Sequence, residues 1–143
     1  FTDVERPVMR KHTRTIAGDG ISQSVVIQPS ARVSYTQPVV VLTSGFSASA
    51  TEVFTLAMRA LPQVTTVGET TIGALSDILE KPLPNGWRVG LANEVYYDAD
   101  ENVFEVVGIP PDVEVSAFAK LERDAGQDSA LNAALEAVGF DFE

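Results

Sequence analysis

The sequence predicts an α/β fold in which strand–helix units build a largely parallel sheet, with one antiparallel hairpin added. An apolar strand at 39–42 is followed by a short turn of small residues and then by a helical pattern that ends at Pro62. A second apolar strand follows at 64–67. Farther along, Pro84-Asn85-Gly86 marks the turn of a hairpin between residues 78–83 and 87–97.

The first 37 residues are polar and weakly patterned. We expect residues 1–37 to be a partly irregular connecting segment with one short strand at 25–27. Residues 38–143 are expected to form a single domain. Its first strand, 39–42, is continuously apolar and β-branched, which is typical of a strand buried on both faces.

The helical pattern after this strand has apolar residues at helical spacing, namely Val53, Leu56, Ala57, Ala60 and Leu61. A further strand is expected at 103–107, before the rigid turn at 108–112. A closing helix begins near Ser129 and ends before Gly139, with an apolar face made by Leu131, Ala134, Leu135 and Val138. Trp87, at the start of the second hairpin strand, is expected to be a packing residue.

The composition excludes several classes of function. The 20 acidic residues outnumber the 10 basic ones, and a net charge of −10 disfavours nucleic acid and anionic membrane surfaces as partners. The absence of cysteine excludes disulfides, thiolate zinc sites and cysteine nucleophiles. No apolar run approaches the ~18 residues of a membrane-spanning helix. The chain starts with Phe1 and not with Met, so we expect a piece of a longer protein.

Ser49 is the strongest candidate for a catalytic residue, because it lies between a predicted buried strand and the start of a predicted helix. Backbone N–H groups are unpaired there and the helix dipole is positive, which stabilises an oxyanion. The neighbouring alanines, Ala48 and Ala50, leave the approach open. The alternative is that Ser47, Ser49 or Thr51 only caps the helix, with Glu52 in its first turn.

Five segments, in order, resemble the tricorn and C-terminal-processing peptidases, and together they cover about residues 38–138. The nucleophile segment of that family is an apolar strand followed by Ser/Thr-Ala-Ser-Ala-Ser/Thr-Glu. The matching segments are Val-Val-Val-Leu-Thr-Ser-Gly-Phe-Ser-Ala-Ser-Ala-Thr-Glu (39–52), Val-Gly-Glu-Thr-Thr-Ile-Gly (67–73), Leu-Pro-Asn-Gly (83–86), Gly-Ile-Pro-Pro-Asp-Val-Glu-Val (108–115) and Gly-Gln-Asp-Ser-Ala-Leu-Asn-Ala-Ala-Leu (126–135).

The resemblance implies a ClpP/crotonase-like α/β core and a serine peptidase that needs no metal or other cofactor. It implies that Ser49 is the nucleophile and that the N–H of Ala50 is an oxyanion donor. Glu105, three residues before Gly108, matches a glutamate that helps to orient the catalytic network in the tricorn-like subgroup. The family also places a substrate-flanking loop at Glu69, Thr70, Thr71 and Gly73.

Two of these assignments also have a purely structural explanation. Glu105 has apolar neighbours and is equally explained as the outward face of an edge strand. Turn chemistry alone explains the polar residues of the loop at 69–71. A metal site at Asp98, Asp100 and Glu101 is disfavoured, because the spacing lacks the glycine and the distal glutamate of a calcium loop.

The general base is the main departure from the family pattern. The lysine of the C-terminal-processing subgroup would stand at Ala74, 25 residues after Ser49. The tricorn-like subgroup takes a histidine from well before the nucleophile. His12 is the only histidine here, lies outside the matching segments and is expected to be a solvated surface residue. The base is therefore expected from the remainder of the protein's own chain, and this piece alone should be nearly inert.

The predicted function is hydrolysis of peptide bonds in peptides or proteins by acyl transfer through Ser49. The alternative is a catalytically inactive family member that acts as a ligand-binding or assembly module. Oligomerisation is possible on either interpretation. Resemblance to bacterial members of the family points to the cell envelope or to secretion.

Overall fold

The structure is a computed structural model that describes residues 1–15, 18, 20–32 and 34–140. It contains, in chain order, β1 (Arg6–Thr13), β2 (Ile21–Ile27), β3 (Val39–Thr43), α1 (Ala50–Arg59), β4 (Val64–Gly68), β5 (Ile78–Pro82), β6 (Arg88–Ala92), β7 (Glu94–Asp98), β8 (Val113–Glu114), α2 (Lys120–Ala125) and α3 (Ser129–Ala137). The predicted α/β fold with an antiparallel hairpin is confirmed.

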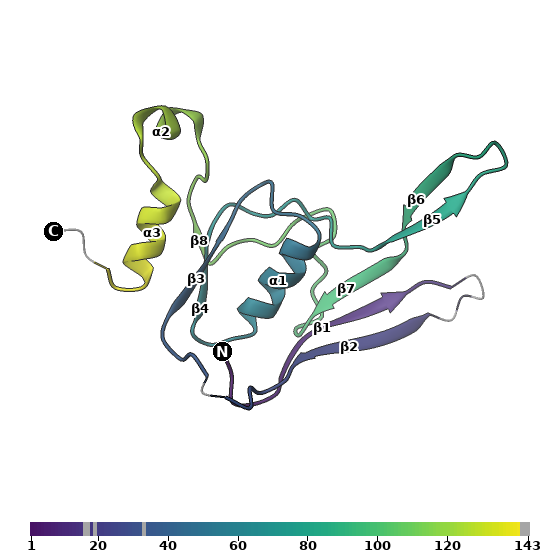
Figure 1. Cartoon of the computed structure of the whole chain (residues 1–143), viewed down its shortest axis with the longest axis horizontal. Helices are drawn as coiled ribbons and strands as arrows, with labels where there is room; N and C mark the ends of the chain where they lie inside the picture. Colours follow the sequence, from purple (N-terminus) through teal and green to yellow (C-terminus); the bar gives the residue numbers. More distant parts are fainter. Residues whose placement is uncertain (16–17, 19, 33, 141–143) are drawn as a thin grey trace.

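The parallel sheet has the strand order β3-β4-β8, and β3 pairs with β4 from Val39 opposite Val64 to Thr43 opposite Gly68. Figure 1 shows α1 and α3 on opposite sides of this sheet. α1 packs against β4 and β1, whereas α3 packs against β3 and β4. The strand–turn–helix unit from β3 to α1 therefore brings the Ser49 segment to the carboxyl end of a parallel strand.

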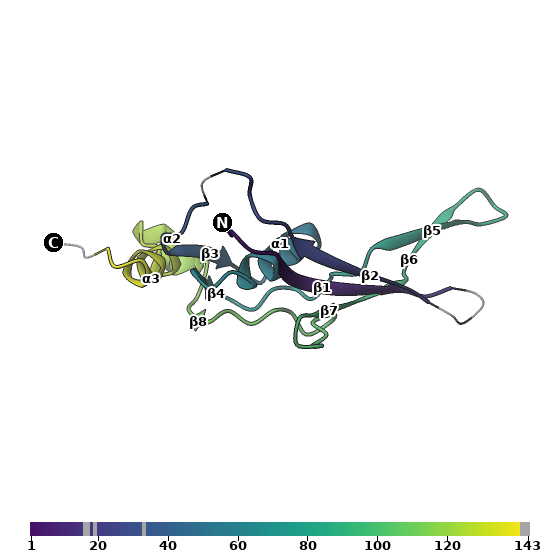
Figure 2. The ribbon, with the colours of Figure 1, turned by 90° about the horizontal axis from the view of Figure 1, so that it is seen from below.

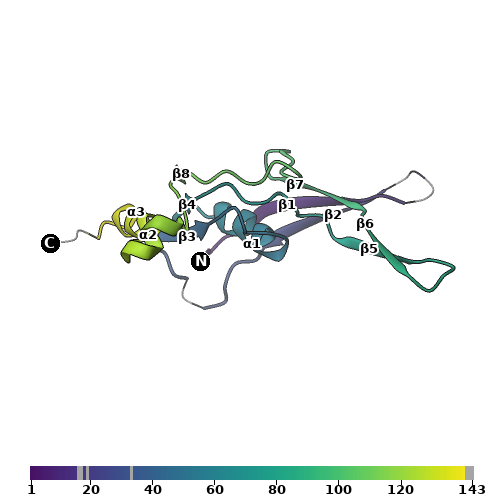
Figure 3. The same ribbon diagram turned by 90° about the horizontal axis from the view of Figure 1, so that it is seen from above.

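Two antiparallel units complete the fold. The first is a sheet in the order β2-β1-β7, and the second is the two-stranded β5-β6 ribbon. Both the β1-β2 hairpin and the β5-β6 ribbon extend away from α2 and α3, as the views from two further directions also show (Figures 2 and 3). Every residue of β5 is exposed, so the ribbon carries little of the core.

The core lies between α1 and the β1-β7 sheet. Its buried cluster contains Val8, Met9, Leu56, Leu75 and Ile109, and the predicted apolar face of α1 packs against it. Leu75 and Ile109 belong to the two irregular segments beside the Ser49 turn. Burial of these two side chains fixes the backbone of both segments next to the amino end of α1.

The structure differs from the sequence-based expectation in three segments. Residues 1–37 contain two long paired strands, β1 and β2, where one short strand at 25–27 was expected. The expected strand at 87–97 breaks at Asn93, and its second half, β7, pairs with β1. Residues 103–107 form no strand and instead turn at Glu105–Val107, so the edge-strand explanation of Glu105 is wrong. In the first two segments, pairing between strands that are distant in sequence determines the structure.

The predicted burial was also wrong at several positions. Leu42 is 48% exposed, because β3 lies at the edge of its three-stranded sheet and is not covered on both faces. Trp87 is 72% exposed near the ribbon turn and does not pack. α3 contacts the sheet through the buried Ala130 and Ala134, so Leu131 of its predicted apolar face stays 44% exposed.

Candidate active site

Ser49 immediately precedes α1, after a tight turn that follows β3. The turn is closed by hydrogen bonds from Ser47 N to Ser44 O (2.9 Å) and from Ser44 N to Ser47 Oγ (3.1 Å). Ser49 itself is exposed and has φ 56° and ψ −122°. A side chain other than glycine pays about 1–3 kcal/mol in such a conformation, and this strain persists only where the surroundings enforce it.

The backbone N–H groups around Ser49 divide into bonded and available donors. Ser49 N donates to Ala74 O at 3.1 Å and to the Glu52 carboxylate at 3.0 Å. Thr51 N donates to Ala48 O, and Glu52 N donates to Ser49 O. Within the described part of the chain, no acceptor is found for the N–H of Ala50. This N–H lies at the positive end of the α1 dipole, so it can donate to an incoming anion.

Glu52 lies beneath this turn and is completely buried. Its Oε1 accepts hydrogen bonds from Thr71 Oγ1 (2.6 Å) and Gly73 N (2.8 Å). Its Oε2 accepts from Ala74 N (2.8 Å), besides Ser49 N. From the sequence, Glu52 was expected only to lie in the first turn of the helix. The capping-box spacing of Ser49 and Glu52 is the signal that could have identified its contact with the Ser49 amide.

Glu105 occupies a turn that packs on the same loop. Its Oε2 accepts hydrogen bonds from Leu75 N and Ser76 N, both at 2.9 Å. The turn is held by Val106 N, which donates to Gly73 O at 2.7 Å, and Val106 has a positive φ of 73°. Ser49 bonds to Ala74 and Glu105 bonds to the next residue, Leu75. The structure therefore brings Ser49 and Glu105 to consecutive residues of one loop.

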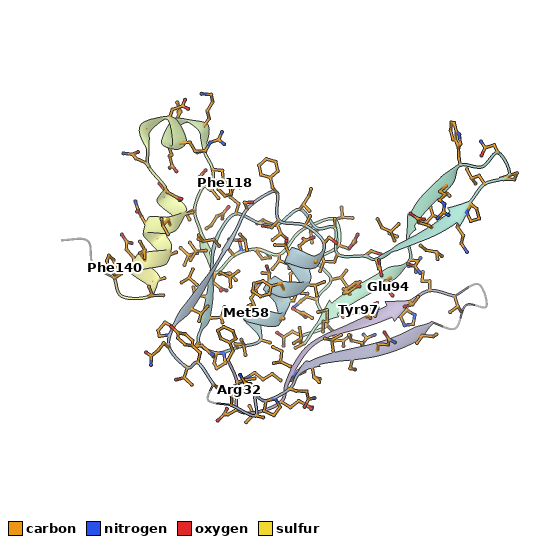
Figure 4. The ribbon with its side chains drawn as sticks, in the orientation of Figure 1. Arg32, Met58, Glu94, Tyr97, Phe118 and Phe140 are labelled. Atoms are coloured by element: carbon orange, nitrogen blue, oxygen red, sulfur yellow. The ribbon has the colours of Figure 1, made fainter. Side chains whose placement is uncertain are left out.

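A second polar network on β7 adjoins this loop; Figure 4 labels Glu94 and Tyr97 on this strand. The Glu94 carboxylate accepts hydrogen bonds from Lys11 Nζ (3.2 Å), Thr13 Oγ1 (2.9 Å) and the Tyr96 hydroxyl (2.8 Å). Burial alone would raise the pKa of Glu94, but these hydrogen bonds outweigh it and the pKa is lowered. Burial, reinforced by the Glu94 bond, raises the pKa of Tyr96. Glu94 N donates to Ser76 Oγ, which connects the network to the loop whose amides donate to Glu105.

Glu69 makes its contacts within the protein. Its carboxylate accepts hydrogen bonds from Ala117 N (3.0 Å) and Gly45 N (3.1 Å), so it joins the loop after β8 to the turn before Ser49. Hydrogen bonds from these two amides hold the pKa of Glu69 below its ordinary value. Figure 4 labels Phe118, the residue after Ala117, between β8 and α2.

The remaining loop residues from the sequence analysis fall into two groups. Thr71 and Gly73 are buried and bond to Glu52, next to the Ser49 turn. Thr70 instead lines a shallow surface groove with Arg59 and Phe104.

The position of the family lysine and the one histidine of the sequence have different surroundings. Ala74, at the position of the family lysine, is exposed, and its carbonyl accepts the Ser49 amide. Position 74 therefore lies beside the nucleophile candidate. His12 is on β1 in the antiparallel sheet, where its Nδ1 lies 2.9 Å from Ser22 Oγ of β2. The described residues include no group of three or more potential metal ligands. In the same residues, no helix has the length and apolar character needed to cross a lipid bilayer.

Comparison with known proteins decides the family. The sequence model of peptidase family S41 matches residues 3–115 of this chain. The chain belongs to peptidase family S41. The predicted membership in the tricorn and C-terminal-processing group is thereby confirmed, and the matched residues include β1 and β2. A search of curated protein sequences found no match.

Solved structures give the same fold. A candidate peptidase from Parabacteroides merdae ATCC 43184 is 30% identical, with a TM-score of 0.82 over 96% of this chain and 44% of its own. The photosystem II D1 C-terminal processing protease is 22% identical, with a TM-score of 0.59 over 81% of this chain and 28% of its own. The tricorn protease is 23% identical, with a TM-score of 0.61 over 71% of this chain and 10% of its own. This S41 chain thus spans less than half the length of each of these proteins.

Proposed function

We propose that this chain is the nucleophile-bearing part of a serine peptidase that hydrolyses peptide bonds by acyl transfer. Ser49 Oγ attacks the carbonyl carbon of the scissile bond while its proton passes to a general base. The oxyanion that forms accepts a hydrogen bond from Ala50 N. The base returns the proton to the leaving amine, the C–N bond breaks, and water then hydrolyses the acyl-Ser49 ester.

The strained backbone of the exposed residue Ser49 is the observation that carries this proposal. A helix cap needs no positive φ, since cap residues ordinarily have extended backbone. A serine held at φ 56° at the amino end of a helix resembles the strained strand-to-helix turn that exposes the nucleophile of other serine hydrolases. The unbonded Ala50 N–H on the same turn supplies the complementary donor. Both features support the proposal that Ser49 is the nucleophile and that the N–H of the next residue, Ala50, is the oxyanion donor.

The base comes, on this proposal, from the remainder of the protein's own chain. Ala74 leaves the family lysine position beside Ser49 without a proton acceptor, and His12 bonds to Ser22 on the hairpin. Glu105 supports the incoming base through another group, and the bonds from Leu75 N and Ser76 N to its Oε2 hold the carboxylate beside the Ser49 loop. Peptides or proteins are the substrates, as the family membership suggests.

A fluorophosphonate probe tests the proposal. The full-length protein, the 143-residue chain and a Ser49→Ala variant of the full-length protein are treated with the probe, and adducts are mapped by mass spectrometry. We expect an adduct on Ser49 of the full-length protein and none on the chain alone. A folded full-length protein that stays unlabelled would refute the peptidase proposal. That result would favour the alternative, an inactive module that binds a ligand or mediates assembly.

A further inference from the structure

Glu52 is a buried acidic residue that the proposed mechanism does not use. Its relative exposure is 0%, and its two oxygens accept four hydrogen bonds from Ser49 N, Thr71 Oγ1, Gly73 N and Ala74 N. None of the salt bridges among the described residues includes Glu52. Burial of a carboxylate without a cation is costly, and hydrogen bonds to the charged form are what offset that cost.

The donors to Glu52 come from two separate parts of the candidate site. One is the amide of Ser49, the residue with the strained backbone. The other three belong to the loop at 71–74, whose next residue, Leu75, donates to Glu105. Gly73 O also accepts from Val106 N, the residue after Glu105. One side chain therefore fixes the turn that carries the nucleophile and the loop that holds Glu105.

We infer that Glu52 is a positioning residue of this active site, an inference that rests on the proposed function. Its Oε2 bonds to Ser49 N and Ala74 N together, which sets the position of the Ser49 backbone relative to the 71–74 loop. This bond opposes relaxation of Ser49 from its positive φ to an ordinary helix-cap conformation. The carboxylate thus acts on catalysis through the backbone of the nucleophile, without touching the substrate.

The position requires a carboxylate and not merely a polar side chain. Each oxygen of Glu52 accepts two of the four hydrogen bonds, whereas glutamine has a single acceptor oxygen. In either orientation of the amide, its NH₂ group would face two of the donors. If that group faces Ser49 N and Ala74 N, the link between the nucleophile and the loop is lost. If it faces Gly73 N, the loop itself is displaced.

The test compares Glu52→Gln with wild type in the full-length protein, using the rate of fluorophosphonate labelling at Ser49 per folded molecule. Asp112→Asn is the matched control. Asp112 also accepts from a backbone amide and a hydroxyl, Thr66 N and Thr66 Oγ1 (both 2.8 Å), but it joins β4 to the loop before β8. We expect Glu52→Gln to lower labelling and kcat by about 10- to 100-fold, as a small misplacement of reacting groups does, while KM changes little. Asp112→Asn should leave the labelling rate per folded molecule unchanged.

A milder variant covers the case in which Glu52→Gln does not fold. Thr71→Val removes one of the four donors to Glu52, and with it the acceptor of Ile109 N, but leaves the carboxylate bonded to the three amides. A smaller fall in the labelling rate per folded molecule is therefore expected. Labelling at the wild-type rate in Glu52→Gln, or in Thr71→Val where Glu52→Gln does not fold, would overturn the inference, and so would an equal loss in Asp112→Asn. Failure of the wild-type protein to label would instead refute the proposed function itself, which keeps the two outcomes distinct.

Discussion

Substitution of Gly73 by alanine tests how tightly the loop beside Ser49 is held. Gly73 has φ +79°, a conformation in which an L side chain is strained. A Cβ atom at this position would lie 2.6 Å from Gly108 N and 2.8 Å from Val106 C. Both are backbone atoms, so no flexible side chain can move aside. The loop and the Glu105 turn must separate to accept the methyl group.

Two terms set the size of the effect. The left-handed backbone conformation costs an alanine about 1–2 kcal/mol. Forcing an extra carbon into a closely packed contact costs a further ~1–3 kcal/mol. We therefore expect Gly73→Ala to lower the free energy of unfolding by about 2–5 kcal/mol, a large share of the ~5–15 kcal/mol that stabilises a typical domain.

Gly86→Ala is the matched control, because Gly86 has φ +85° and nothing within 4 Å of the added Cβ. Gly86→Ala therefore measures the cost of the backbone conformation alone, and it should lower the free energy of unfolding by no more than about 1–2 kcal/mol. Both variants are unfolded in urea and the two free energies are compared at one temperature. Equal costs for the two variants would show that the contact between the loop and the Glu105 turn is not closely packed. Such a result would mean that this contact does not position Glu105.

Three further predictions concern charge and the missing base. Ala74→Lys should allow fluorophosphonate labelling of Ser49 in the 143-residue chain alone, because it places an amine beside the proposed nucleophile. A folded variant that stays unlabelled would contradict the proposal that a base at position 74 can activate Ser49. Glu105→Gln should slow labelling of the full-length protein by about 10-fold or more if the carboxylate supports the base, with unchanged labelling as the contrary result. The pKa of Glu69 is held below its ordinary 4.5 by two backbone amides, so its stabilising contribution is present above that pH and is lost as the pH falls through the folded pKa. The stability difference between wild type and Glu69→Gln, measured by urea unfolding, should therefore be constant above about pH 5 and shrink below pH 4.5; a difference that does not change with pH would refute this linkage.

The sequence was informative where structure follows from local pattern. The strand–turn–helix unit around Ser49 could be predicted because the apolar strand, the small turn residues and the helical spacing all lie within 39–61. The order of motifs identified the family, which the match over residues 3–115 then confirmed. These signals need no knowledge of which strands pair.

Pairing between strands distant in sequence could not be predicted from local pattern. β1 is mostly polar, with an uninterrupted polar run from Arg10 to Thr13, and appeared irregular, yet it is the central strand between β2 and β7. Glu105 was expected on a strand because its neighbours are apolar, but Val106 is 85% exposed in a turn. The turn is set by the contact of Gly73 with Gly108, which no spacing in the sequence reveals. The same holds for Glu69, whose partners, Gly45 and Ala117, lie 24 and 48 residues away.

On the proposed function, the contacts of Ser49 explain how the nucleophile and the base can be supplied by separate stretches of one chain. The features that this chain contributes are backbone features: the positive φ of Ser49, the open N–H of Ala50 and the amides that engage Glu52 and Glu105. They depend on packing within one continuous segment from β3 to the Glu105 turn. A general base needs only to reach the exposed Ser49 side chain, and the small, exposed Ala74 beside it leaves that approach open. On the proposed function, preorganisation of the nucleophile is therefore local, whereas proton transfer depends on how the rest of the protein docks on this face.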